Sequence, residues 1–174
     1  MRAFQSHALW LICILAIPLG AAAAAPAKWR SFTSPAGDFT VLMPGKPQAI
    51  ETVHKSFVGA VKETNYTITS GGVTYSASYS ELPGIAVSMG GSGTIFKKAK
   101  EGLLKEAGGT ENSFTETSLG NSEGRELNFT LNGGGTGKAR FFLIDKRLYV
   151  VVASGPAGAE ATVSRFLNSF KLLS

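Results

Sequence analysis

The histidine at position 54 is the first residue to consider for catalysis, because histidine exchanges protons near neutral pH. A Ser-His-Asp arrangement would have to combine His54 with Asp38 or Asp145. The other histidine, His7, lies in the N-terminal segment, so a multi-histidine metal site is not expected in the rest of the chain. We therefore interpret His54 as a strand residue and expect no enzymatic activity.

Two glycine-rich segments invite comparison with phosphate-binding loops. Residues 132–138 read NGGGTGK, but the glycine spacing is one residue short of a P-loop and a strand is expected after it. We interpret this segment as a hairpin loop. The second segment holds Gly90, Gly91 and Gly93 and precedes an expected helix with Lys97 in its first turn. We interpret this segment as a mobile connection. The alternative is that the helix start holds an anion weakly, which makes these residues candidate ligand or partner contacts.

Tyrosines form a third pattern with binding potential. In residues 73–81, Tyr75 and Tyr79 alternate with hydroxyl residues at a spacing of two, which places them on the apolar face of a strand. Tyrosine is a frequent contact residue in binding sites. We interpret the tyrosines as core or half-buried packing residues. The alternative is that Tyr75 and Tyr79, with Phe141, line a ligand pocket between helices and sheet.

The charge pattern argues against nucleic-acid binding. The chain has 17 Lys and Arg against 12 Asp and Glu, a formal net charge of +5 at pH 7, and no run of five like charges. Nucleic-acid surfaces usually cluster their basic residues. On neighbouring expected strands, Glu123, Arg125 and Glu126 should lie near Arg140 and Arg147 and form a structural cross-strand charge ladder. No His, Cys, Asp or Glu pattern has metal-ligand spacing, and we predict no metal and no cofactor.

Residues 1–24 have the pattern of a cleavable secretory signal. The uncharged stretch at 8–19 is shorter than the roughly 20 residues that a helix needs to span a bilayer. A run of alanines follows, and we expect cleavage after Ala24. The single cysteine, Cys13, lies inside this segment, so the remainder at 25–174 would hold no disulfide. The sequence thus predicts a bacterial periplasmic or secreted protein with one domain and no transmembrane segment after cleavage.

Hydrophobic periodicity predicts mostly antiparallel strands with two helices. Strands are expected near 29–32, 39–43, 48–55, 58–70, 73–81, 112–119 and 124–132. Two more are expected: one that follows the glycine-rich segment at 132–137 and ends at 144, and one at 147–153. The last of these is apolar nearly throughout, which is typical of a central strand covered on both faces. Amphipathic spacing predicts helices at about 94–107 and 157–169. We predict an α+β fold with a curved antiparallel sheet of about seven to eight strands and both helices packed against it.

The order of these features resembles that of a known family. The pattern consists of turn and packing residues: WxxF at 29–32, GxFxVxMPG at 37–45 and RFLxSF at 165–170. It is similar to that of small exported bacterial domains with the PsbP-like α/β/α sandwich, and PsbP itself is an extrinsic lumenal subunit of photosystem II. The resemblance implies a curved antiparallel sheet with helices on its faces and an accessory, non-catalytic role. It carries over no metal-ligand residues.

These observations together predict a non-catalytic accessory or interaction module of the cell envelope. Its expected partner is another envelope protein, bound through a sheet face or a loop. A small-ligand carrier with a pocket between helices and sheet is the alternative.

Overall fold

The strands in the described part of the chain form two antiparallel sheets. The computed structural model describes residues 28–56 and 59–173. Its elements follow one another in the order β1 (Arg30–Ser34), β2 (Phe39–Met43), β3 (Gln48–Ser56), β4 (Gly59–Ser70), β5 (Val73–Glu81), α1 (Gly84–Ala107), β6 (Gly109–Leu119), β7 (Ser122–Leu131), β8 (Thr136–Ile144), β9 (Arg147–Gly155), α2 (Glu160–Asn168) and β10 (Lys171–Leu172). The N-terminal segment expected to be an export signal lies outside the described residues.

Seven strands form the large sheet, in the order β3-β4-β5-β9-β8-β7-β6, with all neighbours antiparallel. Local turns fix most of this order. Gly71 and Gly72 join β4 to β5 with φ angles of 59° and 77°, and Asp145 joins β8 to β9 with φ 54°. Glycine and aspartate suit such left-handed turn positions, which match the twist of a tight hairpin. Pairing of β5 with β9 then joins the two halves of the sheet.

The opening hairpin does not join the large sheet. It forms a three-stranded sheet in the order β1-β2-β10, in which the last strand pairs with β2. The predicted antiparallel sheet with two helices is therefore confirmed as the large sheet, but the prediction did not include the separate small sheet. Strand β10 was not predicted, because it has only two residues and pairs with β2 near the other end of the sequence.

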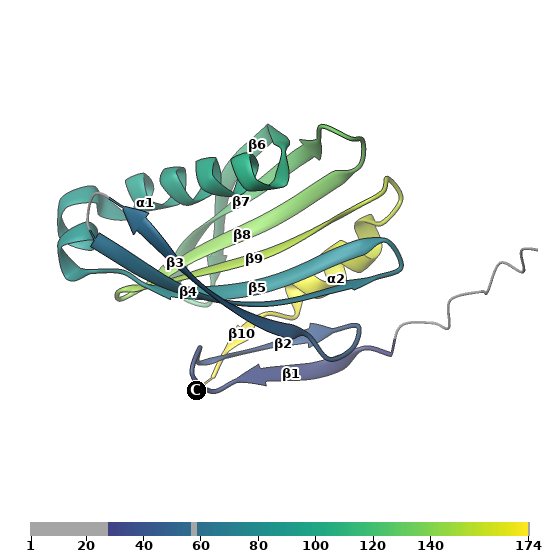
Figure 1. The fold of residues 1–174 in the computed structure, drawn as a ribbon, viewed down its shortest axis with the longest axis horizontal. Helices are drawn as coiled ribbons and strands as arrows, with labels where there is room; N and C mark the ends of the chain where they lie inside the picture. The colour runs from purple at the N-terminus through teal and green to yellow at the C-terminus, as the bar shows by residue number, and fades with distance from the viewer. Residues whose placement is uncertain (1–27, 57–58, 174) are drawn as a thin grey trace, which may run out of the picture.

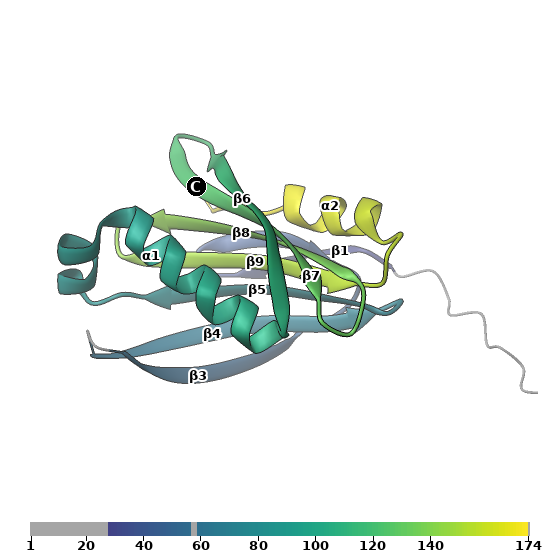
Figure 2. The ribbon, with the colours of Figure 1, turned by 90° about the horizontal axis from the view of Figure 1, so that it is seen from above.

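The two faces of the large sheet are covered by different layers. Helix α1 lies across one face, and α2 with the small sheet covers the other (Figures 1 and 2). Strand β9 lies between β5 and β8 and alternates between the two clusters, with Tyr149, Val151 and Ala153 on the α2 side and Val150 and Val152 on the α1 side. The prediction of a central strand covered on both faces is confirmed.

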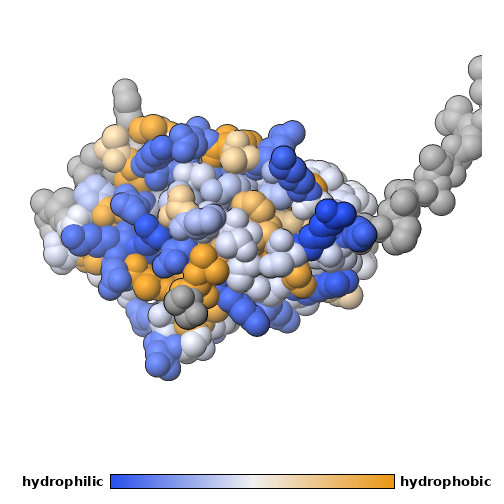
Figure 3. Space-filling model, turned by 90° about the horizontal axis from the view of Figure 1, so that it is seen from below, coloured by the Kyte–Doolittle hydropathy of each residue, from blue (hydrophilic) through white to orange (hydrophobic). Residues whose placement is uncertain are grey.

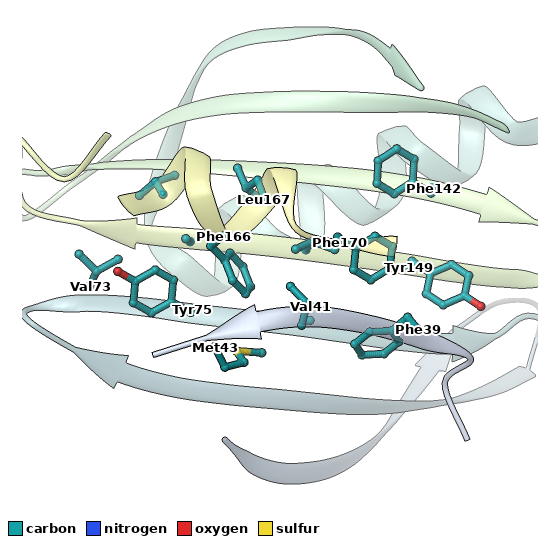
Figure 4. Close-up of a cluster of buried hydrophobic side chains, with 14 residues drawn as sticks. Phe39, Val41, Met43, Val73, Tyr75, Phe142, Tyr149, Phe166, Leu167 and Phe170 are labelled. Carbon is teal, nitrogen blue, oxygen red and sulfur yellow. The ribbon is translucent and has the colours of Figure 1, made fainter. Parts of the chain in front are cut away.

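Aromatic rings fill the space between the large sheet, α2 and the small sheet. Phe39 of β2, Phe166 of α2 and Phe142 of β8 are at most 2% exposed, and Phe170 stacks on Phe142 with ring centroids 6.0 Å apart. Figure 4 shows side chains of β2 facing those of α2 and of the large sheet. Burial of rings of this size is the main stabilising contribution of the layer.

Helix α1 differs from its predicted extent. It begins at Gly84, about ten residues before the expected start, and it is interrupted at Gly91, whose φ of 62° and ψ of 165° are non-helical. Only glycine adopts such a conformation without strain. After the interruption, Phe96 is fully buried against the sheet, and Leu103 and Leu104 pack beside it. No helix in the described part of the chain is long and apolar enough to cross a membrane.

Candidate functional site

The residues singled out from the sequence lie on opposite sides of the large sheet. Gly90, Gly91, Gly93 and Lys97 belong to α1, which covers one face. Tyr75 points to the other face, into the cluster with α2 and the small sheet. The period of two along β5 causes this separation, because it directs every tyrosine of the strand away from α1. These residues therefore do not form one site.

The glycine segment is a break within a helix and not a loop in front of one. Residues on both sides of Gly91 are helical, so a second helical stretch starts after the break, close to the expected start, and the prediction missed only the helical residues before it. Ser92 lies beside the break and donates a hydrogen bond to Glu123 at the start of β7, which ties this turn to the sheet. Lys97 is exposed.

The structure does not bring Tyr75, Tyr79 and Phe141 together in one pocket. Tyr75 is 2% exposed and packs edge-on against Trp29, with ring centroids 5.4 Å apart. Phe141 is fully buried, but in the cluster under α1 on the opposite face of the sheet. A single cavity cannot be lined by both rings, and the interpretation of Tyr75 as a core residue is confirmed.

Tyr79 borders a small open hollow at one end of the sandwich. The hollow has a volume of about 220 Å³ and is lined by Ala36, Lys62, Thr64, Tyr79 and Glu81. Its charges are already paired. Glu81 accepts a hydrogen bond from the Arg147 guanidinium at 2.6 Å, and the guanidinium lies 5.4 Å from the Tyr79 ring centroid.

The ammonium group at this hollow is paired as well. Lys62 and Glu51 form an ion pair at 2.9 Å, and their hydrogen bond raises the pKa of Lys62. The paired charges therefore leave no free cation or acid among the lining residues to fix a charged ligand.

The predicted charge ladder is present around Glu126. Its carboxylate binds Arg140 at 2.7 Å and Lys138 at 3.1 Å, and the Arg140 guanidinium also donates to the Leu167 carbonyl near the end of α2. Burial alone would raise the pKa of Glu126, but the hydrogen bonds from Arg140 and Lys138 outweigh it and lower the pKa. Glu123 and Arg147 do not join this group, since they bind Ser92 and Glu81 instead.

Replacing Glu126 by glutamine should remove an acid-dependent contribution to stability. Because the folded-state pKa is lowered, this contribution is present above the unfolded-state pKa and is lost as the pH falls through the folded-state pKa. We expect Glu126→Gln to lower the free energy of unfolding by roughly 1 kcal/mol at pH 7. Urea denaturation from pH 7 to pH 3 should show the difference shrinking with acid. A constant difference at all pH values would contradict this role for the carboxylate.

The sequence contains a match to a catalytic motif that the sequence analysis missed, but the structure places this match in a hairpin turn where it cannot form a nucleophile elbow. Gly120, Ser122 and Gly124 match Gly-x-Ser-x-Gly, the sequence of a nucleophile elbow. An elbow needs a strand before the serine and a helix after it, whereas this segment is the hairpin turn from β6 to β7. His54 lies in β3, paired with Val61, at the far edge of the large sheet from this turn. Among the described residues there is also no group of three His, Cys, Asp or Glu that could hold a metal.

The free edges of the large sheet are not equivalent. The edge strand β6 has a register shift between Glu111 and Ser113, and Lys100 of α1 forms an ion pair with Glu111 at 2.5 Å. A bulge and a covering element both protect an edge from further strand pairing. Strand β3, at the other edge, pairs with β4 at all nine residues without a register shift. Within the part of the chain that the structure describes, no other strand pairs with its outer edge, so it presents a regular row of backbone groups for pairing.

Strand β3 also carries the two large hydrophobic residues that are exposed in the described part of the chain. Ile50 is 45% exposed and Val53 is 62% exposed. Cross-strand pairing places Ile50 on the α1 side of the sheet and Val53 on the α2 side. The sequence reading identified 48–55 only as an extended segment, because exposure at an edge depends on the strand order.

A second hollow lies where β2 passes into β3. Its volume is about 390 Å³, and its lining includes Phe32, Pro44 and Pro47 with the cations Lys28, Arg30 and Lys46. On the same side of the molecule, hydrophilic and hydrophobic residues are interspersed, as Figure 3 shows. The sequence reading missed this cationic group, because its three members are separated in the chain and are brought together by the turn into β3.

Comparisons with known proteins identify the fold. No family model and no curated protein sequence matches this chain. The solution structure of cyanobacterial PsbP (CyanoP) from Synechocystis sp. PCC 6803 is similar with a TM-score of 0.58 and 13% sequence identity, over 89% of this chain and 99% of CyanoP. A protein of unknown function from Pseudomonas aeruginosa is similar with a TM-score of 0.39 and 9% identity, over 77% of this chain and 90% of that protein. The predicted resemblance is confirmed at the level of architecture: the chain has a PsbP-like fold.

Proposed function

We propose that this protein is a non-catalytic interaction module of the cell envelope that binds an extended segment of another protein along β3. The observation that carries the proposal is the regular, unprotected edge of β3 with two exposed hydrophobic side chains. An extended peptide can add a strand to such an edge. Its affinity then comes from main-chain hydrogen bonds, and its specificity comes from side chains at alternate positions.

The geometry of β3 indicates what such a segment must contain. Ile50 and Val53 lie on opposite faces of the sheet, so a partner strand would contact them with residues of both its faces. Burial of both side chains favours β-branched or aromatic residues in the partner. The nine residues of β3 offer a pairing length typical of strands in proteins.

The remaining features favour binding over catalysis or ligand transport. The core clusters are filled by side chains, and the hollow beside Tyr79 is lined by charges that are already paired. The accessory character of the proposal also agrees with the PsbP-like fold, although a fold by itself specifies no function. The envelope location rests on the export signal expected at residues 1–24.

A selection from a phage-displayed library of random linear peptides tests the proposal with a matched pair of variants. Val53→Lys places a charge on the β3 edge, and Thr115→Lys places one on the β6 edge, on the same face of the sheet. Both residues are exposed, so both variants should fold. Peptides selected on the wild-type protein should bind Val53→Lys roughly tenfold more weakly and Thr115→Lys with unchanged affinity, because the lysine prevents burial of the valine position.

Hydrogen exchange should locate the bound peptide. We expect slower exchange of amides in β3 on binding, and no change in β6. Selected peptides that bind both variants equally, or that protect amides elsewhere, would contradict the proposal. Sedimentation of the free protein provides a further check: a dimer that Val53→Lys dissociates would show that a second copy of the chain occupies the edge, and the proposed partner would then be wrong.

A further inference from the structure

The cationic hollow adjoins the beginning of the proposed binding edge. Its lining ends at Pro47, and β3 begins at the next residue, Gln48. In Figure 1, β3 starts beside the end of β2 and the start of β1. The first residues of β1 and the connection from β2 to β3 line the hollow. A partner chain that pairs with β3 therefore passes this hollow where it extends beyond Gln48, the first residue of β3.

The three cations of the hollow are free to bind a partner. Lys28, Arg30 and Lys46 are exposed and form no ion pair with any described residue of the chain. Pro44 and Pro47 restrict the backbone on one side of the hollow. Three like charges around one concave surface produce a positive potential that attracts carboxylates.

The direction of the partner strand follows from the pattern of the sheet. All described strand pairs are antiparallel, and an antiparallel strand on β3 ends where β3 begins. The residues that follow such a strand in the partner would lie over the hollow. Building on the proposed function, we infer that the partner segment is a strand followed on its C-terminal side by acidic residues, which bind Lys28, Arg30 and Lys46.

Charge complementarity favours this partner over a second copy of the chain. A second β3 paired with the first would bring only one acid, Glu51, because β3 reads QAIETVHKS. Glu51 is already in an ion pair with Lys62. The cations of the hollow would remain without partners in such a dimer, whereas an acidic flank neutralises them.

Peptides with matched flanks test the inference. The probe is a library peptide whose binding depends on Val53, extended with three glutamates or three glutamines at either end. We expect glutamates at the C-terminal end to tighten binding about tenfold at low salt, with little effect at the N-terminal end. The gain should shrink as salt is raised, because exposed ion pairs are screened.

A pair of triple variants provides the control. Lys28→Gln with Arg30→Gln and Lys46→Gln should abolish the advantage of the glutamate flank and leave binding of the glutamine peptide unchanged. The same change at the exposed α1 residues Lys97, Lys98 and Lys105 should preserve the advantage.

Each other outcome has a definite meaning. Peptides that require Val53 but bind equally with either flank would overturn this inference while the proposed function stands. A glutamate preference at the N-terminal end would show a parallel strand and would also overturn it. Binding of phosphatidylglycerol vesicles that requires the three hollow cations, without a flank effect in peptides, would assign the hollow to a membrane surface. A library without Val53-dependent peptides would remove both the proposed function and this inference.

Discussion

Replacing Phe39 by alanine should lower the free energy of unfolding by roughly 3–5 kcal/mol, a large part of the 5–15 kcal/mol typical of a domain. Phe39 is fully buried at the centre of the cluster between the two sheets. Its ring contacts Phe170, with centroids 5.2 Å apart, and Tyr66 and Tyr149 at 6.0 and 6.3 Å. Truncation would remove these contacts and leave a cavity that the surrounding rings cannot fill without leaving their own positions.

Urea denaturation of Phe39→Ala and Phe39→Leu would measure this effect. The leucine variant retains most of the buried volume and should lose less than half as much stability. A loss below about 1 kcal/mol for the alanine variant would show that the β1–β2 hairpin unfolds separately from the large sheet, because the ring would then contribute nothing to the cooperative transition.

The second large effect is expected at Gly124 in β7, where a side chain has no space. A Cβ atom there would lie 2.6 Å from the Phe141 carbonyl oxygen on β8 and 2.5 Å from the Phe142 ring. The carbonyl belongs to the backbone of the neighbouring strand, so rotation of a side chain cannot relieve the contact. We expect Gly124→Ala to lower the free energy of unfolding by about 3 kcal/mol through displacement of β7 from β8.

Gly102 in α1 provides the matched control for this substitution. A Cβ atom at Gly102 meets nothing within 4 Å, and the residue is exposed in the helix. Gly102→Ala should therefore raise stability by up to about 1 kcal/mol, because alanine has the higher helix propensity. Thermal denaturation should show shifts of opposite sign for the two variants. Equal shifts would indicate that the close approach of β7 and β8 at Gly124 is relaxed in solution.

Local patterns predicted most strands of this fold, and non-local pairing explains what they missed. The alternation around Tyr75 and the turn residues Gly71 and Asp145 depend on neighbours in sequence, so their strands and hairpins were predictable. The separate small sheet was not, because Lys171 and Leu172 form a strand only through pairing with Thr40 and Phe39. Two residues contain no periodicity to detect.

Helix α1 shows that helix propensity alone does not predict the extent of a helix. Its first part contains Gly84, Gly90 and Gly91, which argue against a helix, yet the chain is helical on both sides of the break at Gly91. Packing in the folded chain overrides intrinsic preference there. The binding features follow the same rule: the edge position of β3 and the grouping of Lys28, Arg30 and Lys46 depend on strand order and connection, which no local pattern specifies.

The pairing of β2 with β10 has a consequence for the order in which the chain folds. Synthesis and export both deliver a polypeptide from its N-terminus, so β2 is available long before α2 and β10. Contacts of such long sequence separation form slowly because of the entropy lost in closing the loop between them. The large sheet can cover part of the apolar face of the β1–β2 hairpin early, but the part that packs against Phe166 and Phe170 stays uncovered until the last residues arrive. A chain that stops before Glu160 would keep this part of the face exposed, and such incomplete chains should aggregate and require a chaperone.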